Sequence, residues 1–322
     1  MISADGAMPP LLPSDDPGAV VTVGTFDGVH RGHHAVLEEI NRRAARTGRR
    51  SVLVTFHPHP LRIVRPEFAP RLLTIPSEKK EFLAESGVQY AIFLEFTSAL
   101  QQYSPRRFVT EILLGRLGMK ELVMGYDHGF GKDREGTVDT MRELGEEFGF
   151  AVDVVGEVRV GGDAISSSKI RQALERGDVV AAAEALGRPY SLQGRVIEGM
   201  KRGRELGFPT ANIQLEDAEK MLPKEGIYAV HGLIGAERIP GLLHLGPRPT
   251  FPGYPPSVEL YLLDWSGDLY GRSVRVDFCA FMREIEPYKS ADKLVEQLHR
   301  DVEHGRAVFA DPASTACGKL GS

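Results

Sequence analysis

Residues 24–33 read Gly-Thr-Phe-Asp-Gly-Val-His-Arg-Gly-His, and they lie between an apolar run, Ala19 to Val23, and a helical pattern from His33 to Arg46. A glycine at a strand end, here Gly24, lets the backbone turn sharply and approach a phosphate. The first turn of the following helix offers N–H groups to an anion. The stretch predicts a strand–turn–helix unit that binds phosphate.

The histidines of this stretch indicate what the unit does with a phosphate. His30 and His33 flank Gly32 and can both face the turn, where they can donate hydrogen bonds to one phosphate. This suits nucleotidyl transfer, in which positioning and charge stabilisation supply most of the catalysis. The alternative is a structural turn with solvated histidines. The glycines, the preceding strand and the following helix favour the first interpretation.

Strand-like and helix-like patterns alternate through the first half of the chain. We expect strands at 19–23, 51–56, 89–96, 121–124 and 151–158, and helices at 33–46, 77–86, 105–117 and 137–148. Such alternation implies βαβ units and a doubly wound parallel sheet. In these sheets ligands bind at the carboxyl ends of the strands.

The pattern changes near Gly187-Arg188-Pro189, after which helices almost disappear. Short strands separated by Gly/Pro-rich breaks are expected at 191–198, 210–215, 226–234, 238–245, 258–265 and 273–282. They predict a small antiparallel barrel. A helix from Ser290 to Val308 follows, and its apolar face (Leu294, Val295 and Leu298) should cover the barrel. The fold class is therefore α/β plus β, with domains at 18–187 and 188–310 and a disordered tail at 311–322.

Composition limits the classes of function. The chain has 322 residues, 42% of them hydrophobic and 26% charged, which is typical of about two globular domains. A net charge of −5 gives no general affinity for nucleic acid. Two cysteines, Cys279 and Cys317, make neither a disulfide framework nor a metal site, and they fit a reducing compartment. No membrane span and no signal peptide are expected, so we predict a cytoplasmic protein.

A second candidate phosphate-binding segment opens the helix after the fifth strand. It reads Ser166-Ser167-Ser168-Lys169-Ile170-Arg171. Serines cap helices, and Lys169 and Arg171 can meet phosphates beside the positive end of the helix. By itself the segment is equally explained by simple capping. Together with residues 24–33 it resembles the HxGH nucleotidyltransferase superfamily, and the resemblance implies that ATP binds at Gly24, Phe26, Asp27, Gly32, Ser166, Ser167, Ser168, Lys169 and Arg171.

Two segments between these motifs resemble bacterial FAD synthetases. Residues 55–60 read Thr-Phe-His-Pro-His-Pro, and residues 125–136 read Gly-Tyr-Asp-His-Gly-Phe-Gly-Lys-Asp-Arg-Glu-Gly. The resemblance implies flavin binding by His59, Pro60, Asp127 and Phe130. Taken alone, His59 is as well explained as a loop residue held by backbone contacts. The chain departs from the family at His128, where Phe is usual, and at His57, where an acidic residue is frequent.

The barrel half opens with a second constellation. Its loop carries Gly199, Gly203, Arg204 and Gly207, and then Pro209-Thr210-Ala211-Asn212 begins a strand. A glycine-spaced loop with an arginine can surround phosphates. Thr210 and Asn212 alternate onto one face, where a hydroxyl and a carboxamide can hold Mg²⁺ bound to ATP. The alternative is a hairpin with a polar face. The stretch resembles the riboflavin kinase signature, which implies phosphate binding by the loop residues and Pro209.

A kinase also needs a group that accepts the proton of the substrate hydroxyl. The resemblance points to Glu259, which alternation places with Tyr261 on the face opposite Val258, Leu260 and Leu262. An acidic residue in such a strand would otherwise be interpreted as facing solvent. The resemblance also implies riboflavin binding by Arg283. Departures from the family are His244 where Asn is usual, Tyr261 where His is usual and Ile285 where Glu is usual.

The resemblance covers roughly Val20 to Arg306 and points to the bifunctional bacterial riboflavin kinase/FAD synthetase family. It implies that Mg²⁺ and ATP serve to phosphorylate riboflavin to FMN and that a second ATP adenylylates FMN to FAD. The alternatives are an enzyme with one of the two activities and a flavin-binding protein without turnover. The partners expected are riboflavin, FMN and ATP, with no nucleic acid and no membrane; protein partners are not required, and self-association stays open.

Overall fold

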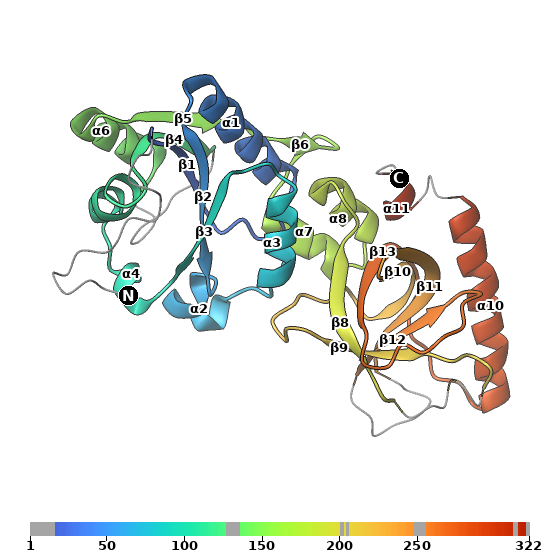
Figure 1. Cartoon of the computed structure of the whole chain (residues 1–322). Helices are drawn as coiled ribbons and strands as arrows, with labels where there is room; N and C mark the ends of the chain where they lie inside the picture. The colour runs from blue at the N-terminus through green and yellow to red at the C-terminus, as the bar shows by residue number, and fades with distance from the viewer. Residues whose placement is uncertain are drawn as a thin grey trace. The chain divides into compact units, whose positions relative to one another are not determined.

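The computed structural model describes residues 17–126, 136–199, 203, 206–247, 256–311 and 315–319 (Figure 1). The predicted sites Asp127, Phe130 and Arg204, together with His128, lie outside these residues. By its contacts the chain divides into two compact units, Met1–Ile165 and Ser166–Ser322.

The first unit holds a parallel sheet with the strand order β3-β2-β1-β4-β5. Its strands are β1 (Ala19–Val23), β2 (Arg50–His57), β3 (Tyr90–Glu95), β4 (Met119–Gly125) and β5 (Ala151–Val155), and a small hairpin adds β6 (Arg159–Val160) and β7 (Asp163–Ala164). The helices are α1 (Arg31–Thr47), α2 (Leu61–Val64), α3 (Pro76–Ala84), α4 (Ser98–Gln101), α5 (Pro105–Phe108) and α6 (Val138–Phe148), with a 3₁₀ turn η1 (Pro66–Phe68) and a π turn η2 (Val109–Leu114).

Alternating side chains give this sheet two apolar faces. Val20, Leu53 and Val123 pack in one cluster with α1 and α3. Their neighbours along the strands, such as Val21 and Val54, pack in another cluster with α5, η2 and α6. Helices on both faces of a parallel sheet make the doubly wound fold that the sequence predicts.

The second unit contains a closed antiparallel barrel. Among the described residues six strands close in the order β10-β11-β12-β9-β8-β13. Their bounds are β8 (Ser191–Ile197), β9 (Ala211–Leu215), β10 (Gly226–Ile234), β11 (Glu237–Gly246), β12 (Ser257–Leu262) and β13 (Ser273–Arg283). Closure leaves no strand edge unpaired. The fold class predicted from the sequence is confirmed.

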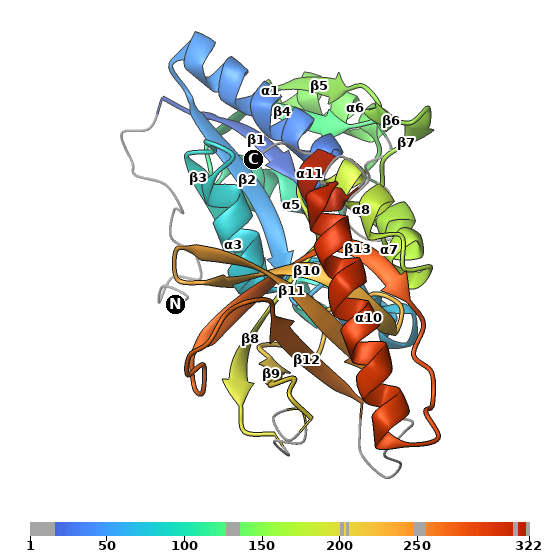
Figure 2. The same cartoon turned by 90° about the vertical axis from the view of Figure 1, so that its right-hand side faces the viewer.

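Helix α10 (Ala291–Ala310) lies along the outside of the barrel (Figure 2). The expected apolar face is only half-buried, whereas Asp301 and Gly305 are buried. A Cβ at Gly305 would stand 2.6 Å from Leu242 Cδ2, so the missing side chain allows the helix to approach β11 closely. The spacing of apolar residues predicts a different buried face, because it takes no account of the buried Asp301 and Gly305.

Two short helices at the start of the second unit, α7 (Ser167–Glu175) and α8 (Val179–Leu186), differ from the expected domain limits. The sequence placed them in the first domain, but the contacts place them with the barrel. Gly177 lies against the ring of Phe281 on β13, and the N–H of Lys224 donates to the carbonyl of Leu174 at 2.8 Å. The limits of 18–187 and 188–310 stay a prediction for the domains as functional modules.

The C-terminal tail also differs from its expectation. Residues 316–319 form a short helix, α11 (Ala316–Lys319), which contacts α8 and β13. Thr315 and Ala316 are buried. Moreover, Cys279 and Cys317 are joined in a single disulfide, whereas the sequence predicted no disulfide framework. Sequence spacing could not reveal the pairing, because 38 residues separate them and folding alone brings them together.

Candidate functional site

The motifs of the first unit follow strands at one edge of the sheet. Residues 24–33 follow β1, residues 58–60 follow β2, and Tyr126 follows β4. All three strands are parallel, so their carboxyl ends lie at the same edge. From β1 the chain continues through β2 and β3 on one side of the sheet and then crosses to β4 and β5 on the other side of β1. Such a switch point is where open α/β sheets bind ligands.

The loop after β1 has an unusual backbone. Phe26, Gly28 and Val29 have φ of 46°, 88° and 39°. Positive φ is uncommon for residues other than glycine and is costly for a β-branched residue such as Val29. Strain of this kind persists only where the surroundings hold it. The loop is therefore held in a shape that the chain would not adopt by itself.

Asp27 is one of the groups that hold this loop. Its side chain is buried and accepts hydrogen bonds from the backbone N–H groups of Leu73 (3.1 Å) and Thr74 (3.0 Å). The Thr74 hydroxyl in turn accepts from the N–H of Gly28 at 3.0 Å. The sequence predicts Asp27 as a phosphate-binding residue, and these contacts describe it as a residue that positions the loop.

Lys79, on α3, is a second anchor that sequence reasoning missed. Its ammonium donates to the carbonyl of Thr25 at 2.7 Å. Burial lowers the pKa of Lys79, and the negative charge of Asp27 opposes that shift. In the sequence Lys79 stands in an ordinary helical pattern beside Lys80, and no local signal distinguishes the buried lysine from the exposed one.

His30 and His33 are brought together at the start of α1. Their rings stack with centroids 3.6 Å apart. Each Nδ1 accepts the backbone N–H of the other residue at 3.3 Å, a reciprocal cap of the helix terminus. A nitrogen that accepts carries no proton, so in each neutral ring the proton resides on Nε2. Phe26 packs against His33 at 4.6 Å.

The remaining predicted residues of the adenylyl-transfer site fall into two groups. His59 Nδ1 accepts the N–H of Leu61 at 3.2 Å, and Pro60 precedes α2. Ser166 caps α7, since its hydroxyl accepts the N–H of Lys169 at 3.3 Å. Ser168 and Lys169 are exposed, while Ser167 and Arg171 are half-buried. Because residues 166–171 belong to the second unit, their joint site with His30 and His33 stays a prediction.

The barrel brings the predicted kinase residues together between β12 and β9. Glu259 pairs with Asn212 across the two strands. The Thr210 hydroxyl donates to Glu259 Oε2 at 3.1 Å, and the Ser257 hydroxyl donates to Oε1 at 2.9 Å. Buried Val258, Leu260 and Leu262 alternate with half-buried Glu259 and Tyr261, as the sequence predicts. A carboxylate, a hydroxyl and a carboxamide thus share one surface.

Glycines of the preceding loop lie against these side chains. A Cβ at Gly199 would stand 2.0 Å from the Asn212 amide nitrogen, and one at Gly203 would stand 3.1 Å from the Thr210 hydroxyl. Gly207 has φ of 86°, and Pro209 is exposed. The loop therefore approaches the polar face so closely that a side chain at either of the first two positions would displace it.

Arg283, which the sequence predicts to bind riboflavin, is paired with a carboxylate in the structure. Its Nε and Nη2 donate to the two carboxylate oxygens of Asp301 at 2.8 and 2.6 Å, and Nη1 donates to the carbonyl of Glu284. These bonds raise the pKa of Arg283 despite its burial. The guanidinium thus fastens α10 to the end of β13.

Family models and relatives agree with these two constellations. Residues 12–169 match the FAD synthetase model, and residues 186–309 match the riboflavin kinase model. A solved structure described as a macrolide-efflux protein from Streptococcus pneumoniae is 30% identical, with a TM-score of 0.81 over 93% of this chain and 98% of that one.

Within the described parts of the chain, no helix has the length and apolar character needed to cross a membrane.

Relatives named bifunctional riboflavin kinase/FMN adenylyltransferase match along almost their whole length. The protein from Escherichia coli K12 is 36% identical, over 91% of this chain and 93% of its own. The protein from Pseudomonas fluorescens is 38% identical, over 92% of this chain and 94% of its own. The chain therefore belongs to the bifunctional riboflavin kinase/FMN adenylyltransferase family.

Proposed function

We propose that this chain makes flavin cofactors in two steps. The barrel unit phosphorylates riboflavin with ATP to give FMN and ADP. The N-terminal HxGH module then transfers AMP from a second ATP to FMN, giving FAD and pyrophosphate. The observation that carries the proposal is that both family models match within one chain, each over the constellation that its chemistry needs.

In the kinase step Glu259 accepts the proton of the ribityl 5′-hydroxyl as its oxygen attacks the γ-phosphorus of ATP. Two hydroxyl donors, Thr210 and Ser257, orient the carboxylate. The Gly199 to Gly207 loop, with Arg204 and Pro209, surrounds the phosphates. Positioning and charge stabilisation, and no covalent enzyme intermediate, supply the rate.

The donor set around Glu259 fits Mg²⁺, which prefers oxygen ligands. The Thr210 hydroxyl donates its hydrogen bond to Glu259, so the lone pairs of its oxygen remain to face a cation. Asn212, the register partner of Glu259, adds a carboxamide oxygen. Thr210 and Asn212 would hold the ion with ATP, and it would neutralise charge on the phosphates.

In the adenylyl-transfer step the FMN phosphate attacks the α-phosphorus of ATP and pyrophosphate leaves. His30 and His33 donate from Nε2 to the phosphoryl oxygens, where negative charge builds. The N-terminus of α1 adds N–H groups beside them. Ser166 to Arg171 bind the triphosphate, and His59, Pro60, Asp127 and Phe130 bind the flavin.

Riboflavin, FMN and ATP are the small molecules that the proposed enzyme binds. A cytoplasmic location remains a prediction from the sequence. Self-association stays open. Neither nucleic acid nor a protein partner enters either step.

The test incubates purified protein with riboflavin, ATP and Mg²⁺ and separates FMN from FAD by chromatography. His30→Asn combined with His33→Ala should leave FMN as the end product, with adenylyl transfer at least ~100-fold slower. Asn can still accept the backbone N–H of residue 33, so the variant removes both Nε2–H donors and keeps one half of the reciprocal cap of α1. Glu259→Gln should block FMN formation yet still convert added FMN to FAD.

Exposed residues provide the controls. His304→Ala and Glu237→Gln remove the same kinds of group at exposed positions and should retain both reactions. Loss of both reactions from either site variant, in a folded protein, would contradict separate sites. Formation of FMN without FAD by the unmodified chain would restrict the function to a kinase, and no turnover would leave a flavin-binding protein.

A further inference from the structure

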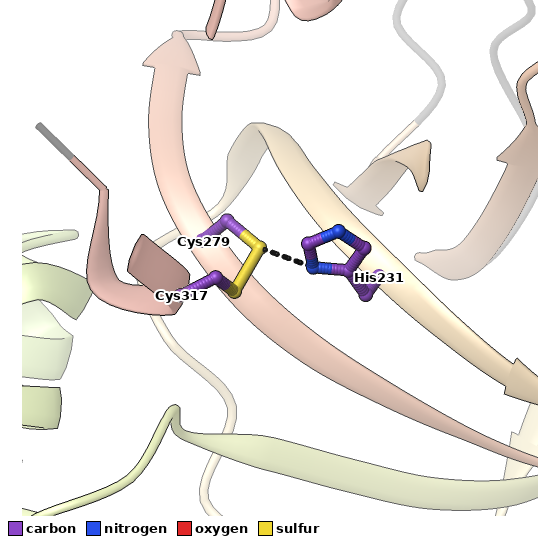
Figure 3. A group of neighbouring side chains, drawn as sticks. All are labelled: His231, Cys279 and Cys317. Carbon is purple, nitrogen blue, oxygen red and sulfur yellow. Dashed lines mark hydrogen bonds between the residues drawn. A yellow bond between two sulfur atoms is a disulfide. The ribbon is translucent and has the colours of Figure 1, made fainter. Parts of the chain in front are cut away.

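Three side chains outside both constellations meet on one side of the barrel (Figure 3). Cys279 on β13 is disulfide-bonded to Cys317 on α11. The Nδ1 atom of His231, on β10, lies 3.1 Å from the Cys279 sulfur. Within the described residues this trio is the one group of three or more His, Cys, Asp or Glu side chains whose ligand atoms lie close enough to hold one metal ion.

The trio joins the end of the chain to the barrel. Cys279 is fully buried, and Cys317 is half-buried. Ala316, next to Cys317, is also fully buried, which shows that α11 is packed and not merely tethered. The ring of Phe309, near the end of α10, lies 5.1 Å from the His231 ring. His231 therefore stands between the last turn of α10 and the disulfide.

The barrel topology separates this position from the kinase residues. In the closed order β10-β11-β12-β9-β8-β13, the trio lies at the β10–β13 seam. Glu259 and Asn212 lie at the β12–β9 seam, three strands away in either direction. A chemical change at the trio can thus occur without altering the residues that we assign to phosphorylation.

We propose that Cys279 and Cys317 form a reversible redox modification site, in which oxidation by a low-molecular-weight disulfide fastens α11 to the barrel and reduction by a thiol releases it. His231 is the base that accepts the proton of the Cys279 thiol.

The chemistry begins at the accessible sulfur. The Cys317 thiolate attacks the external disulfide RS–SR, a Cys317–S–S–R bond forms, and one RSH leaves with the Cys317 proton. Cys317 is the attacking thiol because it lies on the released helix α11, whereas Cys279 lies within β13. Its thiol gives its proton to His231 Nδ1 and attacks the Cys317 sulfur. The Cys317–SR bond breaks, and RS⁻ takes the proton from His231. Two thiols and one RS–SR thus become one protein disulfide and two RSH.

The environment of His231 keeps its ring neutral and also makes it a weaker base. Burial, with a smaller contribution from the positive charge of Arg238, lowers the pKa of His231 from 6.5 to about 4. The ring is therefore neutral near pH 7, and in the dithiol form the tautomer with its proton on Nε2 would accept a hydrogen bond from the Cys279 thiol at Nδ1. The nearest carboxylate on the same strand as Cys279, Asp277, is engaged by Arg275 at 2.9 Å.

The full-length chain provides the test. It is reduced, freed of reductant and exposed to glutathione disulfide, and its intact mass and non-reduced peptide map are recorded. Oxidation should remove two hydrogen atoms from the mass and yield a linked Cys279–Cys317 peptide. Amide hydrogen exchange of residues 315–318 should be at least ~10-fold faster in the reduced form. Cys317→Ser should exchange like the reduced form under both conditions, with both catalytic activities retained.

His231→Gln separates the role of the base from that of packing. It should slow disulfide closure near pH 7 by about 10-fold and leave the final yield unchanged. An unchanged rate of disulfide closure would show that His231 does not act as the base. Equal exchange of residues 315–318 in both redox forms would overturn the release of α11. Purified protein that retains one equivalent of zinc and resists glutathione disulfide would show that the trio binds a metal instead.

Discussion

Gly32 is the residue on which the geometry of the stacked histidines depends most directly. A Cβ there would lie 3.2 Å from both Cε1 and Nδ1 of His30, tighter than ordinary contact. Gly32→Ala should therefore displace the His30 ring and slow FAD formation from FMN by about 10- to 100-fold, as misplacement of a catalytic group does. Initial rates with FMN and ATP measure the effect.

Riboflavin phosphorylation by the same variant is the internal control and should be unchanged, because the residues assigned to it lie in the other unit. Gly48→Ala is a matched glycine variant at the other end of α1, where a Cβ meets nothing within 4 Å. Its positive φ of 67° predicts a small loss of stability but no specific loss of adenylyl transfer. Equal rates for Gly32→Ala and the unmodified chain would show that His30 tolerates displacement.

At the scale of the element, helix α10 depends on the Arg283–Asp301 pair. Asp301→Ala leaves a half-buried guanidinium without its partner and also removes the acceptor of Gln297. The free energy of unfolding of the barrel unit should fall by about 3 kcal/mol, the lower end for breaking a buried pair. Chemical denaturation followed by circular dichroism measures it.

The exposed Glu303, on the same helix, supplies the control. Glu303→Ala should change the free energy of unfolding by less than ~0.5 kcal/mol. The KM for riboflavin in folded Asp301→Ala adds a second measurement. If Arg283 bound the flavin, as the sequence predicts, freeing it from Asp301 would alter that KM. An unchanged KM supports the fastening role.

Elements were predictable where a local pattern coincided with the packing. The runs that became β1 and β2 are apolar and buried almost throughout, and the run that became β12 alternates, so the strands could be recognised from adjacent residues and the faces of β12 could be assigned. Asp27, Lys79 and Arg283 were different. Each is defined by a partner distant in the chain or by burial, and neither leaves a mark in the neighbouring sequence. Local sequence thus predicts strands and motifs, but it does not predict the distant groups that hold the motifs in place.

At the scale of the whole chain, His231 makes stability depend on pH. Its folded pKa of about 4 lies below the unfolded value of 6.5, so the unfolded chain binds more protons between these values. Its contribution to stability is therefore complete above about pH 6.5 and is lost as the pH falls toward about 4. Burial raises the pKa of Asp277, so the contribution of Asp277 to stability falls as the pH rises, opposite to that of His231.

Comparison with His231→Gln isolates the histidine. The unmodified chain should lose more stability than the variant between about pH 7 and about pH 5, measured as the denaturant midpoint of the barrel unit. Both proteins are kept oxidised, so that the disulfide does not differ. Parallel midpoints across this range would contradict a neutral, half-buried His231.

The reciprocal cap between His30 and His33 also restricts when the first helix can carry charge. A proton added to either Nδ1 would turn an acceptor into a donor that faces a backbone N–H. The hydrogen bond between that ring and the helix terminus would then break. Protonation would thus give the imidazoles a positive charge and at the same time fray the first turn of α1. The two histidines and the cap of α1 therefore depend on the same protonation state.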